Sequence, residues 1–372
     1  FNGLHEKCER FPHIISQREQ CSEDYVFGNE VIESHVGRSV VGAVKRRNGE
    51  RVVVKIRQKR IIRRFREMEL IDAEIGTLRK LQHPNVVQLL DVWETPSCLN
   101  MAFERFGKDL YYVMEPYPNK MPEYLIGQVT TPLISILKYI HAQNIAHCDL
   151  KPENIMVCMN ADESQCSVKL TDFELAIEVG DDDYALPQGP RGSEGFMAPE
   201  MFAKRAYNPM KSDIWSLGCV LHELLVGHAE FNDRWMVHYS NLIARDMSHV
   251  DDFMEDLRLS VDITSEDIRN SQYCDLLKST LEISPYLRSS AAEILTRDRA
   301  TIEATNIARL PPTRMRNPLR RRIDEMTDAS DDACDDELDR LFDSPNCVLS
   351  IHRRTVEIPT TTTGKVERRR IE

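Results

Sequence analysis

The stretch of sequence that decides the fold is Ile145-Ala146-His147-Cys148-Asp149-Leu150-Lys151-Pro152-Glu153-Asn154. It sets a carboxylate (Asp149), an ammonium (Lys151) and an amide (Asn154) within one short segment. Transfer of a phosphoryl group needs a group that orients a hydroxyl, a cation for the phosphate and oxygen ligands for Mg²⁺. The stretch therefore predicts a loop that carries phosphoryl-transfer chemistry.

The remainder of the chain has the composition of an ordinary globular protein. A length of 372 residues suits two domains or lobes with a large core. Hydrophobic residues make up 41% and charged residues 29%, as in folded domains generally. The net charge of -12 argues against general nucleic-acid binding, although it is compatible with a local basic patch.

Cysteine usage and hydropathy indicate the compartment. The ten cysteines include no Cys-x-x-Cys pair, so neither a zinc site nor a disulfide framework is indicated. Reduced thiols in the cytoplasm or nucleus are the simplest interpretation. No apolar run reaches the roughly 18 residues of a membrane span, and no signal peptide is visible. Because residue 1 is phenylalanine, we expect residues 1–24 to be a leader that lacks its natural start.

The first hundred residues predict a small sheet and one long helix. Residues 31–56 are rich in Val and Ile, and Asn48-Gly49 between the apolar runs indicates a hairpin. Apolar residues at helical spacing predict a helix over 57–82. Two further apolar runs predict strands over 86–92 and 99–103.

The second part of the chain is expected to be mainly helical. Residues 123–143 predict an apolar-periodic helix, and the nearly all-apolar residues 212–226 predict a buried one. A hairpin is expected between the 145–154 loop and Phe173, and shorter helices to about residue 297. The tail, 298–372, combines an arginine cluster with an acidic stretch, which favours disorder over a packed core.

Several short motifs have an ordinary explanation when each is taken alone. Residues 37–44 fit G-x-G-x-x-G-x-V with Ser39 in the second glycine place. Backbone amides of such a turn can cradle phosphates, but an ordinary hairpin also fits. Lys55 ends a buried-strand pattern, where a lysine commonly snorkels to water. Glu74 lies 19 residues later and could be a solvated helix charge.

The later motifs are equally open when taken one by one. Asp172-Phe173 could be a turn after a strand, and Arg288 could lie on the surface. Ser212 or Asp213 could cap a helix. Residues 198–200, Ala-Pro-Glu, follow Asp172 at a separation of 28 residues.

Together the motifs resemble those of the protein kinase family in order and spacing. Independent coincidence does not explain such an order. The resemblance covers about residues 25–297 and implies an α+β, two-lobed fold. The small β-rich lobe with one helix would span 25–106, and the larger, mainly helical lobe would span 107–297. The motifs, in chain order, are the glycine motif, Lys55, Glu74, His147-Asp149-Lys151-Asn154, Asp172-Phe173, Ala198-Pro199-Glu200, Asp213 and Arg288.

The resemblance implies that ATP binds between the lobes. Phe103 would limit the depth of the pocket, and the backbone of Glu104 and Phe106 would bond the adenine. Lys55, held by Glu74, would grip the phosphates. The further contacts expected with the nucleotide are Val36, Gly37, Ser39, Gly42, Val44, Val53 and Met156.

The same resemblance assigns the chemistry of transfer. Asn154 and Asp172 would bind Mg²⁺. Asp149 would orient the substrate hydroxyl, and Lys151 would offset charge on the transferring group. The Lys-Pro-Glu-Asn sequence after Asp149 resembles serine/threonine kinases rather than tyrosine kinases. Three supports are implied: Ser193 bridging Asp149 and Lys151, Glu200 paired with Arg288, and Asp213 bracing the catalytic loop.

Two positions depart from the family pattern at points that bear on regulation. Cys148 replaces an arginine that commonly binds a phosphate on the activation segment. Cysteine cannot make that contact, so we predict that phosphorylation of the segment is not required; a redox switch at Cys148 is an alternative. Glu174 replaces a glycine, which removes backbone freedom and adds a negative charge. The metal would then be held differently, or the segment would flip less easily. Asp181-Asp182-Asp183 could mimic a phosphate, although a solvated acidic loop is the simpler interpretation.

Charged segments offer two candidate regulatory surfaces. A basic run precedes and enters the first predicted helix, and we expect a solvated face by default. A docking site for an acidic regulatory partner or a phosphate is the alternative. The charged tail could dock on the cleft or serve only as a linker. The basic run comprises Arg57, Lys59, Arg60, Arg63, Arg64 and Arg66.

The sequence thus predicts an active serine/threonine protein kinase that uses ATP and Mg²⁺ on protein substrates, with no membrane or nucleic-acid partner. The alternative is a pseudokinase scaffold, which Ser39, Cys148 and Glu174 favour. Every residue assigned direct chemistry is nevertheless present. A small-molecule kinase is a third option, which the peptide-platform-like segment 192–200 disfavours.

Overall fold

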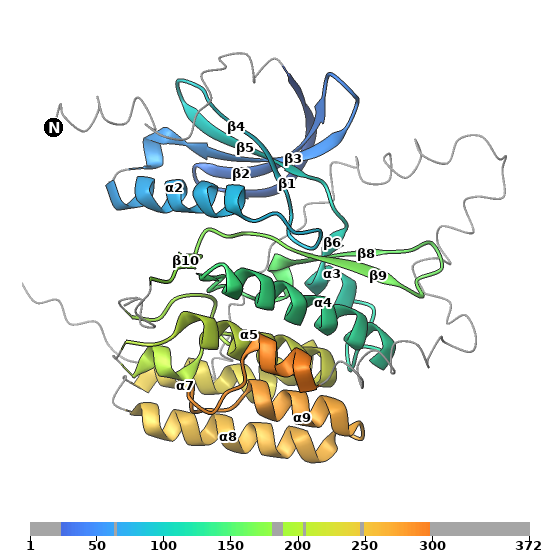
Figure 1. The fold of residues 1–372 in the computed structure, drawn as a ribbon, viewed down its shortest axis with the longest axis vertical. Helices are drawn as coiled ribbons and strands as arrows, with labels where there is room; N and C mark the ends of the chain where they lie inside the picture. Colours follow the sequence, from blue (N-terminus) through green and yellow to red (C-terminus); the bar gives the residue numbers. More distant parts are fainter. Residues whose placement is uncertain (1–23, 63–64, 181–188, 204–205, 246–248, 298–372) are drawn as a thin grey trace, which may run out of the picture.

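The computed structural model describes residues 24–62, 65–180, 189–203, 206–245 and 249–297, which form two stacked lobes (Figure 1). The expected leader before residue 24, the acidic triplet at 181–183 and the charged tail lie outside the described residues. The mixed α+β, two-lobed architecture predicted from the sequence is confirmed.

The upper lobe is a five-stranded antiparallel sheet with one helix packed on it. Ile71 and Ile75 of the helix α2 (Phe65–Lys80) pack against Met101 of the sheet. On the other face, Tyr25 stacks on Trp93 with ring centroids 4.9 Å apart. The strands, in sheet order, are β1 (Tyr25–His35), β2 (Arg38–Lys45), β3 (Arg51–Gln58), β5 (Cys98–Glu104) and β4 (Leu89–Glu94).

The helix begins later than its periodicity predicts. Strand β3 continues to Gln58, and a short 3-10 turn at Lys59–Ile61 follows it, so α2 starts at Phe65 and not at residue 57. Residues 51–58 alternate between the two faces of the sheet, and their pairing with β2 and β5 outweighs local helical spacing. The expected hairpin at Asn48-Gly49 is confirmed, with Gly49 at φ 72°.

The lower lobe is built around two long helices that carry most of its core. Helix α5 (Pro209–Val226) begins at the cap Asn208, whose side chain accepts the backbone N–H groups of Met210 and Lys211. It ends at Gly227, whose φ of 86° suits a residue without Cβ. Its packing partner is α4 (Glu123–Ala142), so both predicted helices are confirmed. The other helices are α3 (Leu110–Met114), α6 (His228–Phe231), α7 (Val237–Arg245), α8 (Val250–Asp267) and α9 (Ser271–Thr280).

Short strands lie where the two lobes meet and position the loops between them. The predicted hairpin is β8 (Ile155–Met159) with β9 (Cys166–Leu170), and β6 (Lys108–Asp109) joins it. The backbone of Leu170 bonds to Asn85 and Val87, which fixes the chain just before Asp172 against the upper lobe. Strand β7 (Ile145–Ala146) pairs with β10 (Ile177–Glu178).

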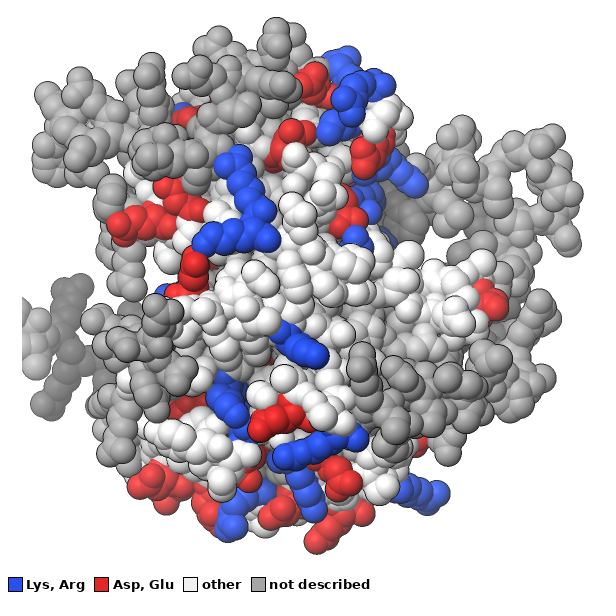
Figure 2. Space-filling view, in the orientation of Figure 1, with Lys and Arg blue, Asp and Glu red and all other residues white. Residues whose placement is uncertain are grey.

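Basic and acidic side chains are interspersed on the face of the molecule that Figure 2 draws. On the face drawn in Figure 2, basic and acidic side chains alternate over both lobes, and the middle is mostly uncharged. Within the described ranges, the helices are too short or too polar to cross a membrane.

Candidate active site

The 145–154 stretch is held from beneath by the buried carboxylate of Asp213. Its Oδ2 accepts the backbone N–H of His147 and its Oδ1 that of Cys148, both at 2.8 Å. Cys148 has φ 63°, a left-handed conformation that costs energy outside glycine and needs such support. Because the cap of α5 is Asn208, the interpretation of Ser212 or Asp213 as an N-cap is wrong.

Asp149, Lys151 and Asn154 converge on one cluster, as their spacing suggests. The Ser193 hydroxyl donates a hydrogen bond to Asp149 Oδ1 at 2.8 Å and accepts one from Lys151 Nζ at 2.8 Å. Lys151 Nζ lies 3.6 Å from Asp149 Oδ2. The Asn154 amide donates to the backbone oxygen and to Oδ2 of Asp149, at 2.8 and 3.1 Å. The cluster can therefore orient a hydroxyl beside a cation.

His147 ties this loop to the segment that carries Asp172. Its Nε2 lies 3.0 Å from the carbonyl oxygen of Thr171, and its ring meets Phe173 edge to face at 4.8 Å. Phe173 is buried in the core of the lower lobe. This anchoring fixes Asp172, whose φ of 60° is also left-handed.

Lys55 joins the upper lobe to Asp172. Its Nζ lies 2.9 Å from Glu74 Oε1 and 2.8 Å from Asp172 Oδ1. Burial opposes the charge on Lys55, but Glu74 and Asp172 outweigh it and raise the pKa of the ammonium. Burial likewise works against the Asp172 carboxylate, whereas Lys55 lowers its pKa. The ammonium of Lys55 and the carboxylate of Asp172 therefore lie together, both charged.

Glu174 is paired with arginine, which the sequence did not indicate. Its carboxylate contacts Arg57 Nη1 at 3.0 Å and Nη2 at 2.9 Å, and Arg38 Nη1 at 2.9 Å. Burial disfavours the charged carboxylate of Glu174, but the neighbouring cations Arg57, Lys55 and Arg38 outweigh this effect and lower its pKa. The φ of Glu174 is not positive, so this position does not need the left-handed conformation that favours glycine.

The interpretation of the basic run as a solvated face is wrong for Arg57. Its side chain points inward from β3 and is 3% exposed. Lys59 is ion-paired with Glu94, and Arg60 bonds Gln58. Arg63 and Arg64 lie outside the described residues, as does the side chain of Arg66.

The glycine motif lies on the hairpin that joins β1 and β2. The hairpin turn is Val36-Gly37, and Gly37 has φ 74°. Ser39, Gly42 and Val44 follow this turn within β2, and their expected contacts with the nucleotide stay a prediction. Gly42 also allows close packing, because a Cβ there would come within 2.4 Å of the Glu30 carboxylate.

The strand register shows a residue near Lys55 that sequence reasoning missed. Val40 pairs directly with Lys55, whereas Val44 pairs with Arg51, which comes four residues before Lys55 on β3. Directly opposed residues share a face of the sheet. Val53 pairs with Gly42 and Phe103, on the same face as Lys55. Val40 is therefore closer to Lys55 than Val44 is.

The residues expected to hold adenine lie where β5 leaves the upper lobe. Phe103 packs against the cores of both lobes. The Glu104 side chain pairs with Lys169 at 2.6 Å, and Lys169 lies over the Phe106 ring at 5.1 Å. The backbone N–H of Glu104 donates to the carbonyl oxygen of Gln88. Met156, on β8, pairs with Lys169 of β9.

Cys148 is packed as a small apolar side chain. It is 4% exposed and lies with Ala146 and Val179 in a minor core cluster. Burial and the neighbouring Asp213 carboxylate raise the pKa of its thiol. A reactive thiolate needs the opposite environment, so the redox alternative is disfavoured.

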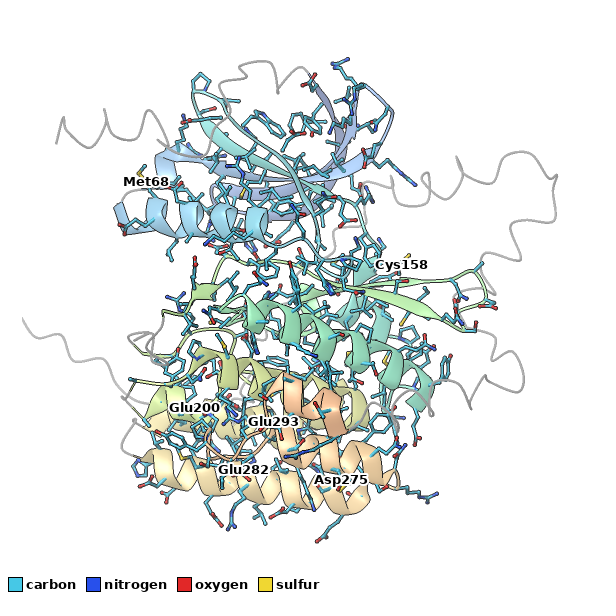
Figure 3. The ribbon with its side chains drawn as sticks, viewed as in Figure 1. Met68, Cys158, Glu200, Asp275, Glu282 and Glu293 are labelled. Atoms are coloured by element: carbon cyan, nitrogen blue, oxygen red, sulfur yellow. The ribbon has the colours of Figure 1, made fainter. Side chains whose placement is uncertain are left out.

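Glu200 and Arg288 form a buried, two-pronged ion pair, with contacts of 2.7 and 2.9 Å. Arg288 is 1% exposed, so its interpretation as a surface residue is wrong. Its Nε also donates to the carbonyl of Glu282; Figure 3 labels Glu200 and Glu282 in the lower lobe. The pair anchors the Ala-Pro-Glu segment in the core.

The donor set suits Mg²⁺ better than a metal that needs many protein ligands. Among the described residues, no three His, Cys, Asp or Glu side chains gather as metal ligands. Mg²⁺ usually keeps several waters and takes one or two protein oxygens plus phosphates. Asp172 offers a carboxylate, and Asn154 turns its amide nitrogen to Asp149, so its oxygen remains as an acceptor.

Comparison with known proteins points in one direction. A family model described as a protein kinase domain matches residues 34–298. The serine/threonine-protein kinase dkf-2 of Caenorhabditis briggsae is 32% identical over 221 residues, 59% of this chain and 18% of that protein. CBL-interacting protein kinase 28 of Oryza sativa subsp. japonica is 31% identical over 233 residues, which are 62% of this chain and 52% of that protein. Serine/threonine-protein kinase RAD53 of Saccharomyces cerevisiae is 27% identical over 293 residues, which are 76% of this chain and 34% of that protein. The chain spans about half or less of these relatives' lengths.

Proposed function

The chain belongs to the protein kinase family, and from that premise we propose that it transfers the γ-phosphoryl group of MgATP to serine and threonine hydroxyls of proteins. One observation carries the proposal. Lys55 contacts Glu74 and Asp172 at once, at 2.9 and 2.8 Å, so the phosphate-binding and metal-binding groups are already assembled.

Each residue has a defined task in this mechanism. Lys55 holds the phosphates, while Glu74 fixes its position. Asn154 and Asp172 would hold Mg²⁺, which would supply positive charge against the charge that develops during transfer. Asp149 orients the attacking hydroxyl and accepts its proton.

Ser193 and Lys151 complete the site on the acceptor side. Lys151, 3.6 Å from Asp149 Oδ2, offsets charge on the transferring group. Ser193 bonds both side chains and keeps them in register. The backbone of Glu104 and Phe106 would bind adenine beside Phe103.

A nucleotide-binding pseudokinase is the second candidate. Glu174 favours it, because its Oε2 lies 3.6 Å from Lys55 and competes for that cation. However, Glu174 also meets Arg57 and Arg38 at shorter distances. The competition is therefore balanced, and catalysis is the better-supported function.

We further propose that the kinase domain spans 25–297 and acts on protein substrates in the cytoplasm or nucleus. The compartment is proposed because the cysteine pattern of the sequence indicates no disulfide framework. A regulatory partner at the basic run would have to use residues other than the buried Arg57.

The proposal is tested by phosphate transfer from MgATP to mixed serine/threonine and tyrosine peptide libraries, with Asp149→Asn in parallel. We expect transfer to serine and threonine that the variant loses. Transfer to tyrosine alone would contradict the acceptor class. Nucleotide binding without transfer would establish the pseudokinase.

A further inference from the structure

Arg57 and Glu174 form a two-pronged ion pair between strand β3 and the Asp172 segment. Nη1 of Arg57 meets Oε1 of Glu174 at 3.0 Å, and Nη2 meets Oε2 at 2.9 Å. Such paired contacts fix the relative orientation of both side chains, which a single contact does not. The two residues are 117 positions apart in the sequence, so the pair is a purely tertiary contact.

Arg57 also reaches α2. Its Nη2 donates to Oε2 of Glu74 at 2.8 Å, while Lys55 occupies Oε1 at 2.9 Å. The carboxylate of Glu74 is therefore shared between two cations from one strand. Both Arg57 and Glu74 are almost fully buried, at 3% and 2% exposure.

The charges of Arg57 and Glu174 cancel each other beside Lys55. Lys55, Glu74 and Asp172 together carry a net charge of minus one. Glu174 adds one negative charge and Arg57 adds one positive charge, so the net charge is unchanged. Removing only Arg57 leaves Glu174 with Arg38 and Lys55, and removing only Glu174 leaves Arg57 with Glu74, so each single change unbalances the network, whereas removing both restores the simpler set.

From these contacts we propose that Arg57 and Glu174 are positioning residues for phosphoryl transfer. The pair clamps the Asp172 segment to β3 and α2, and so keeps Lys55, Glu74 and Asp172 in their catalytic arrangement. The assignment rests on the kinase activity proposed above, because positioning is defined with respect to that reaction. Lysine cannot replace Arg57, because an ammonium is a point charge that lacks the planar fork.

The test compares single and double variants of the full chain. The variants are Arg57→Met, Arg57→Lys, Glu174→Gln and the Arg57→Met/Glu174→Gln double. Steady-state transfer gives kcat and the KM for MgATP, and hydrogen exchange without nucleotide reports on residues 170–178. Lys80 and Glu178 provide a matched control, because they form an exposed ion pair at 2.6 Å between α2 and β10.

We expect each single variant to lower kcat by about tenfold and to speed exchange in 170–178. The double variant should be about tenfold more active than the product of the single effects predicts, because members of one buried network are not additive. Arg57→Lys should behave like Arg57→Met. Lys80→Met/Glu178→Gln should stay within about twofold of the parent, as exposed pairs contribute little.

Two results would overturn the assignment. One is additive single effects, with exchange in 170–178 unchanged. The other is full activity and protection in Arg57→Lys, which would reduce the role of Arg57 to charge alone. If the parent chain binds MgATP without transfer, the kinase proposal fails, whereas faster exchange in the single variants would still establish the clamp. Thermal unfolding of each variant identifies any loss that comes from misfolding, and Glu174→Gln, at 23% side-chain exposure, is the milder change.

Discussion

Replacing Asp213 with asparagine is expected to destabilise the fold and disable the catalytic loop. Oδ1 of Asp213 accepts the backbone N–H of Cys148, and Oδ2 accepts that of His147 and also lies 2.9 Å from His141 Nε2. Asparagine has only one oxygen acceptor, so one charge-assisted hydrogen bond is lost, a cost of about 1.5–3 kcal/mol. Its amide nitrogen then faces a buried N–H, which adds about 1–3 kcal/mol.

The two costs together predict a loss of about 2.5–6 kcal/mol in the free energy of unfolding. For a domain of this size that corresponds to a fall of roughly 10 °C in Tm. Urea unfolding followed by fluorescence measures the loss, because Trp215 and Trp235 are buried in the same lobe.

Asp275→Asn is the matched control, since Asp275 is exposed on α9, in the lower lobe (Figure 3). We expect it to change stability by less than about 0.5 kcal/mol. Equal losses in the two variants, or a loss under about 1 kcal/mol in Asp213→Asn, would refute the reasoning that Asp213 holds the loop.

Three further outcomes follow from the geometry. Arg288→Met should cost about 3–5 kcal/mol in urea unfolding, because it leaves Glu200 buried without its partner, and the Arg288→Met/Glu200→Gln double variant should cost less. In folded protein, Cys148 should resist a thiol reagent that labels the exposed Cys158, and phosphatase treatment should leave activity unchanged; mass spectrometry of labelled peptides and a transfer assay check the two points. Burial lowers the pKa of His222 to about 3, so the unfolded chain binds a proton there that the folded chain does not. The free energy of unfolding should therefore fall as pH drops from about 6.5 towards 3, by up to about 1.4 kcal/mol per pH unit, and His222→Gln should flatten this slope.

The sequence predicted best where one local rule acts alone. The helices at 123–143 and 212–226 and the hairpin before Phe173 lie within a few residues of their predicted positions. Long runs of buried residues in α4 and α5 give these helices an apolar sequence pattern that can be recognised without the structure. The expected pairing of Glu200 with Arg288 depends on two separated residues, and only the spacing of the full motif set indicated it.

The register between strands β2 and β3 was harder to predict. A two-residue turn at Asn48-Gly49 would pair Gly42 with Lys55, but the loop spans five residues, and Val40 takes that place. Such a shift of register depends on loop geometry that composition does not reveal.

The burial of Arg57 was missed for a different reason. In a run of basic residues, each arginine appears solvated, and its partner Glu174 is 117 residues away. The only local signal was alternation: Arg57 is two residues after Lys55 on a strand, so both must point to the same face. That rule could have placed Arg57 beside Glu74.

The buried, apolar Cys148 and the ion-paired Glu174 suggest a common consequence. Cys148 provides no cation for a phosphate on the activation segment, whereas Arg57 and Glu174 hold the Asp172 segment to the upper lobe. We expect the site to assemble by internal contacts, so that its activity does not wait for phosphorylation.

The most direct test of the central claim is the rate of phosphoryl transfer from MgATP to a serine/threonine peptide in the parent chain and in Asp149→Asn. We predict a rate at least about 100-fold lower in the variant, with MgATP binding unchanged, because in the proposed mechanism Asp149 orients and deprotonates the acceptor. Equal rates in the two proteins would contradict the account.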